Sequence, residues 1–353
     1  MADAPDAAPV GCSRPFRTKS GEYVRCQSRL KSKCPSCAEL YRGDWAAIAR
    51  SGIFDADPLA FRFYLLTLTA PSFGAVHRVP KHEGAKVRRC GCGELHSVAD
   101  AELRGVPLDA AGYDYAGAVA WNRDSGVLWD NTRRRLRDHF AGVEFFVVRE
   151  WQDRGALHLH ALVRIPISGA PTDRALGELA RSAVAFSKID GSEVVWGSQF
   201  QCDAFRADGA GAKAIWYLSK ALNYVLKDTT REAGGSASWQ HVARLQAAAR
   251  AMRCSRDCEP ESCASRTHQR FGARGHVVSN TRQTKTRAGW SMTGLTRRAQ
   301  RLARVAWFLA REAARQAEAA RQAAAAPEHI ASALLGVAGR LQLELRSVAP
   351  VVP

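Results

Sequence analysis

The sequence lacks long apolar runs. No 18 consecutive residues are apolar, so no segment has the length and character of a membrane-spanning helix. The first residues, MADAPDAAPVG, lack the charged and apolar regions of a signal peptide, which predicts a cytoplasmic protein with no membrane partner. The phosphate-binding pattern GxxxxGK(S/T) is also absent, so we expect no ATPase activity.

Acidic residues are few relative to basic ones. The 353 residues include 51 Lys or Arg and 34 Asp or Glu, for a net charge of +17. Such a charge favours polyanionic partners, nucleic acid first and acidic membrane surfaces second. From Arg266 to Arg304, ten residues are Lys or Arg and none is Asp or Glu. A one-signed span of this length, which includes Trp290, favours DNA-phosphate binding over an ordinary solvated face.

Ten cysteines in a reducing compartment favour metal ligands or free thiols over disulfides. The pattern C-x13-C-x7-C-x2-C lies among basic residues and predicts a structural zinc site, with buried free thiols as the alternative. Its members are Cys12, Cys26, Cys34 and Cys37. Two less regular groups predict further zinc sites. One combines Cys90, Cys92 and His96 with His77 or His82, and the other combines Cys254, Cys258, Cys263 and His268.

Two segments rich in β-branched and aromatic residues, GVEFFVVREW and ALHLHALVRI, predict a β-hairpin. A turn over residues 153–155 sets Glu150 opposite His158. Side chains alternate along a strand, so His158 and His160 share a face with Glu150. One carboxylate and two imidazoles predict a site for Mn²⁺, Mg²⁺ or Zn²⁺. The alternative for a His-x-His pair is ordinary packing or surface decoration.

Periodicity predicts the remaining elements and an α+β fold, in which an antiparallel sheet is combined with helices. We expect strands at 61–69 and 193–202, a helix at 213–228 and a long helix near 295–326. One further helix should carry Leu128, Thr132, Leu136 and Phe140 on one face. Another should begin at Pro171-Thr172 and carry Leu176, Leu179, Ala183 and Phe186 on one face. Residues 229–238 (TTREAGGSAS) are the best linker candidate.

These elements predict three parts of the chain. Residues 1–50 form a Cys-rich basic zinc-binding segment. Residues 51–228 form a central domain with a Cys/His-rich insertion at 74–115. Residues 229–353 form a Cys-rich, basic and helical region, whose long helix either extends a DNA-binding surface or forms a dimer, so the oligomeric state stays open.

A stripe of two tyrosines and two lysines follows the predicted central sheet. Tyr217, Lys220, Tyr224 and Lys227 share one face of a helix. One interpretation is half-buried tyrosines with snorkelling lysines. The other is phosphodiester cleavage, because a phenol with a pKa of about 10 needs nearby positive charge to act as a nucleophile.

The order of a strand, then Glu150 with His-Leu-His, then Tyr-x-x-Lys resembles the motifs of HUH endonucleases, which are single-strand nickases. More closely, the chain resembles the replication initiators of actinobacterial plasmids over about residues 10–310. The landmarks are CPSCAELYRGDW (34–45), TLTAPSFG (67–74), YDYAGAVAWN (113–122), RGALHLHALVR (154–164), WGSQ (196–199) and RFGARGH (270–276).

The resemblance implies an HUH-like palm and rolling-circle replication. It implies that Glu150, His158 and His160 hold Mn²⁺ or Mg²⁺, that Tyr217 forms a 5′-phosphotyrosyl link with origin DNA, and that Lys220 stabilises developing charge. A host polymerase would extend the freed 3′-OH, and a host helicase would unwind the duplex. The family has a more compact Tyr-x-x-Lys-Tyr-x-x-Lys, so the nucleophile is open between Tyr217, our choice, and Tyr224.

Two alternatives accompany this interpretation. A single-tyrosine transposase or conjugative relaxase uses the same residues. A zinc-dependent DNA-binding regulator would carry the His-Leu-His run incidentally.

Overall fold

The computed structural model describes residues 11–21, 23–214, 236–285 and 287–347. The chain divides into two compact units, Met1–Leu295 and Thr296–Pro353. The expected boundary near residue 228 lies outside the described residues, so the three-part division stays a prediction. Within the described part of the chain, no helix is both long and apolar enough to cross a membrane.

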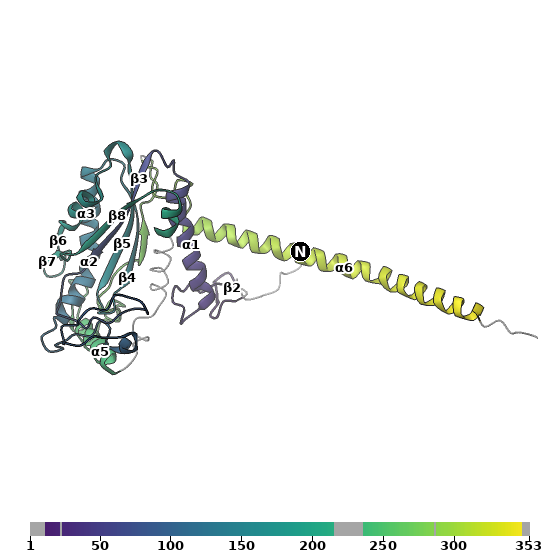
Figure 1. Cartoon of the computed structure of the whole chain (residues 1–353), viewed down its shortest axis with the longest axis horizontal. Coiled ribbons are helices and arrows are strands. Elements are labelled where there is room, and N and C mark those ends of the chain that lie inside the picture. Colours follow the sequence, from purple (N-terminus) through teal and green to yellow (C-terminus); the bar gives the residue numbers. More distant parts are fainter. Residues whose placement is uncertain (1–10, 22, 215–235, 286, 348–353) are drawn as a thin grey trace, which may run out of the picture. The chain divides into compact units, whose positions relative to one another are not determined.

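The first unit is built on a five-stranded antiparallel sheet (Figure 1). Its strand order is β8 (Phe200–Phe205), β3 (Phe61–Thr69), β5 (Leu157–Pro166), β4 (Glu144–Trp151) and β9 (Val278–Asn280). The described helices of this unit are α1 (Pro35–Phe54), α2 (Tyr115–His139), α3 (Asp173–Arg181) and α5 (Ser236–Ala251). Short pieces complete it: β1 (Phe16–Arg17), β2 (Tyr23–Val24), β6 (Val184–Phe186), β7 (Glu193–Val195) and two 3-10 turns, Val98–Leu103 and Ile167–Gly169. The expected α+β class is confirmed.

Alternation along the strands divides the apolar side chains between two cores. Leu159, Ala161 and Val163 of β5 pack in the core that α2, α3 and α5 share with the sheet, which we call the α2-side core. Leu162 points the other way, into the core shared with α1, the α1-side core. The sheet is therefore covered by helices on both faces, and His158 and His160 lie on the α1 side of it.

The hairpin β4–β5 has the predicted register. Glu150 pairs with His158, and Trp151 pairs with Leu157. The Gln152 N–H donates to the Ala156 carbonyl at 2.9 Å, and Gly155 supplies a φ of +77° in the turn. A side chain on Gly155 would also meet Leu245 of α5, so the turn needs glycine for two reasons.

The strand at 61–69 and the helix containing Leu128, Thr132 and Leu136 are also confirmed, whereas Phe140 caps the helix end. Helix α1 was not anticipated. The second unit is α6 (Arg297–Ser347), which continues well past the expected end at residue 326.

Two expectations between residues 171 and 202 are wrong. Helix α3 begins after Thr172 as expected but ends at Arg181, so Ala183 and Phe186 are not on its face, and Phe186 is 62% exposed. The helix ends early because the residues that follow it form strand β6, in which β-branched Val184 pairs with Val195 of β7.

The expected strand at 193–202 is two strands, separated by residues 196–199. The buried Trp196 donates its indole N–H to Thr132 Oγ1 at 2.9 Å, and the Gly197 N–H donates to the Thr69 carbonyl at 2.8 Å. These tertiary bonds bend the chain between β7 and β8.

Candidate metal centres

The hairpin brings one carboxylate and two imidazoles together at the end of the sheet. Glu150 Oε1 lies 3.1 Å from His160 Nε2 and 3.8 Å from His158 Nδ1. One ligand atom from each of these three residues fits within 4.8 Å of the others, so the group could hold a metal ion. We call this group the triad.

Burial and mutual contact set the charge of the triad. Loss of water and the nearby His160 lower the pKa of His158 to about 3, so its imidazole is neutral at pH 7. Burial alone would raise the pKa of Glu150, but the hydrogen bond from His160 and the nearby His160, His158 and Lys81 side chains lower it. A neutral imidazole and an ionised carboxylate are the forms in which these groups bind metals.

The surroundings of the triad suit an ion. His158 Nε2 is buried and has no hydrogen-bond partner among the described residues. Thr67 on the neighbouring strand β3 places its Oγ1 3.0 Å from His160 Nδ1, which orients the ring through the nitrogen that faces away from Glu150. The donor set is mixed nitrogen and oxygen, which fits Mn²⁺, Mg²⁺ or Zn²⁺.

A cavity of about 700 Å³ opens over the triad and includes Glu150 and His158 in its lining. Its walls come from the end of β3, the β4–β5 turn, residues 197–199 and the Cys/His-rich insertion. Four cations line it: Arg78, Lys81, Arg104 and Arg154. A positively charged cleft beside a candidate metal centre is suited to a phosphate-bearing ligand.

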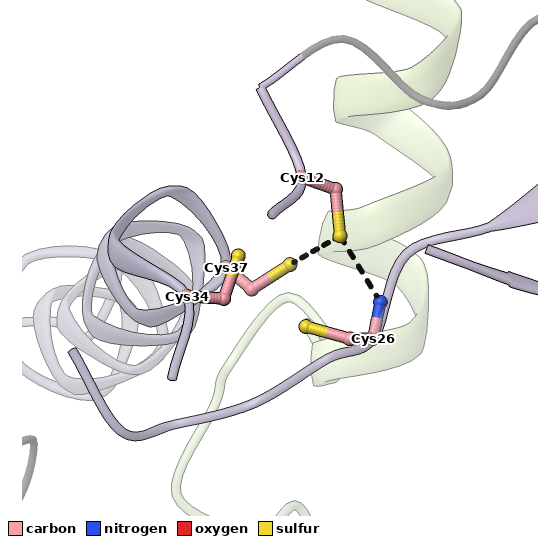
Figure 2. A group of neighbouring side chains, drawn as sticks. All are labelled: Cys12, Cys26, Cys34 and Cys37. Carbon is pink, nitrogen blue, oxygen red and sulfur yellow. Dashed lines mark hydrogen bonds between the residues drawn. The ribbon is translucent and has the colours of Figure 1, made fainter. Parts of the chain in front are cut away.

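The first Cys group converges as the spacing predicts. Figure 2 shows the four sulfurs turned toward one another, two from loops and two from the start of α1. Cys12 Sγ lies 3.7 Å from Cys37 Sγ. Tetrahedral zinc with Zn–S bonds of about 2.3 Å separates two thiolates by about 3.8 Å. A disulfide would need about 2.05 Å, and all ten cysteines are free.

The second group selects His77 rather than His82 as its fourth member. His77 Nδ1 lies 3.7 Å from Cys90 Sγ, and His96 Nε2 lies 3.3 Å from Cys92 Sγ. Tetrahedral zinc separates a thiolate from an imidazole nitrogen by about 3.5 Å. His82 instead places its Nδ1 2.9 Å from the Glu83 carbonyl. Because His77 also lines the cavity over the triad, this group is part of the wall of that cavity.

The third group follows α5. Cys254 and Cys263 Sγ lie 3.7 Å apart, and Cys258 Sγ lies 3.4 Å from His268 Nε2. His268 Nδ1 lies 2.8 Å from the Ala249 carbonyl, so the backbone selects the tautomer that leaves Nε2 for a metal. All three groups could therefore hold an ion such as zinc.

One cysteine in each group is prepared to ionise. Burial opposes this, but N–H donors from Cys37 and Ser13 lower the pKa of Cys34 to about 6. N–H donors from Cys92 and Arg78 likewise lower the pKa of Cys90 to about 6, and a hydrogen bond with the backbone of Cys254 lowers the pKa of Cys258 to about 7. The thiolate is the form that coordinates metals.

The expected nucleophile helix lies outside the described residues. Tyr217, Lys220 and Tyr224 all fall in residues 215–235. Ala214, the last described residue before them, is buried in the α1-side core. The triad lies on that same face of the sheet.

Sequence reasoning missed two residues that position the triad and its cavity. Thr67 is a strand neighbour of His160 in space but is 93 residues away in sequence. Arg154 donates to the Pro71 and Ala70 carbonyls at 2.8 and 3.0 Å, which ties the β4–β5 turn to the end of β3. The signal for Thr67 was its place in the strand beside the His-Leu-His run, readable only once strand order is known.

The fold and these sites define an α+β protein with four candidate metal centres and a strongly basic composition. The family model described as "Replication initiator protein, pSAM2" (RepSA) matches residues 17–341. The chain therefore belongs to this family of replication initiator proteins.

A curated relative is similar in sequence. The chain is 33% identical over 249 residues to a replication initiator protein of Streptomyces ambofaciens, covering 60% of this chain and 52% of the relative. The match thus spans about half the length of the relative. No solved structure matches the chain significantly.

Proposed function

We propose that this initiator nicks one strand of its plasmid origin through a tyrosine and so starts rolling-circle replication. The observation that carries the proposal is the convergence of Glu150, His158 and His160 at the floor of a cleft that Glu150, His158 and four cations line. Strand cleavage at the origin would supply a free 3′-OH from which a polymerase could extend.

The triad would hold Mn²⁺ or Mg²⁺. The ion, when bound, would draw electron density from a non-bridging oxygen of the scissile phosphate. Glu150 would contribute charge, while His158 and His160 would contribute imidazole nitrogen donors. Thr67 keeps the His160 ring in position. Lys81 and Arg104 on the insertion add positive charge along the path of the strand.

Tyr217 is our proposed nucleophile, and Tyr224 is the alternative. The tyrosine oxygen bonds to the scissile phosphorus as the bond from phosphorus to the 3′ oxygen breaks. The phenol loses its proton to solvent, and the departing 3′ oxygen gains one, leaving a 5′-phosphotyrosyl link and a 3′-OH. Lys220 would stabilise the negative charge that develops. A host polymerase would extend the 3′-OH, and a host helicase would open the duplex.

The antiparallel sheet with the triad on its central strands suits an HUH-like palm. The three Cys/His groups would then be structural zinc sites added to it. The first lies in a basic N-terminal segment that would contact origin DNA, and the second would shape the cleft.

The test uses the full chain with its zinc retained. Single-stranded oligonucleotides tiling both strands of the plasmid that carries this gene are incubated with Mn²⁺, and adducts that survive denaturation are counted. We expect one adduct, lost in Tyr217→Phe and retained in Tyr224→Phe. The opposite result would move the nucleophile to Tyr224, and no adduct with any oligonucleotide would overturn the nicking proposal.

The same assay separates the alternatives. A zinc-dependent regulator would bind origin DNA without an adduct. A transposase or relaxase would form an adduct at a site other than the origin.

A further inference from the structure

A second basic cavity, of about 450 Å³, lies between α2 and the edge of the sheet formed by β4 and β9. We call it the arginine cleft. One wall comes from α2, where Arg123, Gly126, Asp130, Arg133 and Arg137 recur at helical spacing. The other wall comes from Phe145, Val147 and Arg149 of β4, from residues 274–276 and from residues 279–281.

The arginine cleft opens on the opposite face of the sheet from the triad. Phe145 and Val147 belong to the α2-side core, whereas Phe146 and Val148 belong to the α1-side core. Arg149 continues the first series and Glu150 the second, because side chains alternate along β4. A ligand in the arginine cleft is therefore distinct from one at the triad.

The arginine cleft contains more arginines than carboxylates to neutralise them. Five arginines line it, and among the described lining residues Asp130 alone is acidic. Arg123 is held by Asp124 and Asp190, at 2.6 and 2.7 Å, and Arg133 by Asp130 at 2.9 Å. Arg137, Arg149 and Arg274 have no carboxylate within ion-pair distance in the described structure.

These three arginines are placed to bind an anion. Arg137 lies over the Phe145 ring at 5.7 Å, and its Nε is buried with no hydrogen-bond partner in the described part of the chain. Burial and repulsion from Arg287 and Arg133 lower the pKa of Arg137, and burial lowers that of Arg149 to about 10. Arg274 is exposed beside Gly275, where an added Cβ would have no atom within 4 Å. An anion in the cleft would relieve this repulsion.

We propose that the arginine cleft binds phosphates of the DNA backbone, as a second contact remote from the nicking centre. Open glycines at 126 and 275 leave room for a backbone, and Ser279 and Asn280 add polar groups. The last residues of the RFGARGH landmark, Arg274 to His276, form one rim, which gives that segment a role outside the triad. The proposal rests on the proposed function only for the identity of the polyanion.

The test measures binding of the full chain to a 30-base-pair duplex and to one of its strands. No divalent metal and no chelator are added, so nicking does not occur and zinc is retained. We expect Arg137→Gln with Arg274→Gln to weaken binding roughly tenfold or more and to reduce the slope of log affinity against log salt by about two for duplex DNA. The DNA form, duplex or single strand, whose binding is weakened more is the form that the cleft holds.

The matched control is Arg134→Gln with Arg135→Gln, two exposed arginines of the same helix that do not line the cleft. It removes the same charge, so an equal loss in both double variants would overturn the proposal. Thermal unfolding checks each fold, and Arg274→Gln alone serves if the double variant fails to fold. If the nicking assay gives no adduct but the arginine cleft still binds DNA, only the nicking proposal is overturned.

Discussion

The triad and the three Cys/His groups hold their ligands in different ways. Glu150 stands on β4 opposite His158, and β5, which carries both histidines, is paired with β4 on one side and β3 on the other, so backbone pairing sets their positions. The Cys/His groups instead draw their ligands mainly from loops and helix ends. The regular structure between Cys12 and Cys26 is limited to the short strands β1 and β2.

This difference separates two uses of a metal. At the triad the paired strands set the positions of the ligands, so under the proposed function an ion would be free to bind and leave during the reaction. In the loop groups the sulfurs are drawn together with little backbone support, so a bound zinc ion would contribute to folding. Metal removal and three substitutions can test that division.

Zinc removal should have the largest effect. Structural zinc sites contribute roughly 10 kcal/mol or more to the folding of small metal domains. A zinc chelator should increase amide hydrogen exchange in residues 11–37, 77–108 and 254–273, while β3, β4 and β5 stay protected. Exchange that rises equally in the central strands would contradict the division, and restoring zinc should reverse the change.

Glu150→Gln should abolish most nicking without loss of fold. The neutral amide keeps the size of the side chain but removes its charge from the ion, so adduct formation should fall by about a hundredfold or more. The control is Glu178→Gln, an exposed carboxylate of α3 that pairs with Arg174 at 2.8 Å and does not line the cavity over the triad. Similar activity in both variants would remove Glu150 from the metal site.

Gly105→Ala should detach the insertion from the hairpin. Gly105 has a φ of +75°, and a Cβ there would lie 2.4 Å from the backbone carbon of Asp153. We expect a loss of about 2 kcal/mol in the free energy of unfolding, from strain and steric overlap together. Gly84→Ala is the control, because its φ is +77° and nothing lies within 4 Å. Equal losses in denaturant unfolding would mean that the close contact contributes nothing.

Thr67→Val should have the smallest effect. It removes the Oγ1 that orients His160, so Mn²⁺ affinity at the triad should fall about tenfold. Thr69→Val is the control on the same strand, because Thr69 Oγ1 donates to the Gln199 carbonyl instead. Calorimetric titration with Mn²⁺ measures both, and unchanged affinity in Thr67→Val would leave the threonine without an orienting role.

The parts of the candidate sites that were predictable depend on short sequence separation. Glu150 and His158 face each other because a tight turn joins their strands, and alternation then places His160 beside them. Close Cys-x-x-Cys spacing made the first zinc group recognisable in the same way. Where a ligand came from a less regular segment, two candidates stayed open, and only the folded loop selected His77 over His82.

Other features depended on contacts between distant residues. The break between β7 and β8 follows from Trp196 packing on α2, which no local pattern encodes. The arginine cleft was missed for a similar reason, because Arg137, Arg149 and Arg274 come from three separate segments.

By itself, the sequence determined the hairpin register, the basic charge and the membership of the first and third Cys/His groups, because each depends on neighbouring residues or on composition. The tertiary structure decided strand order, which set Thr67 beside His160. It also decided which face each site occupies. The physical reason is that these features arise where strands and helices from distant segments pack together, and local periodicity carries no information about which segments will meet.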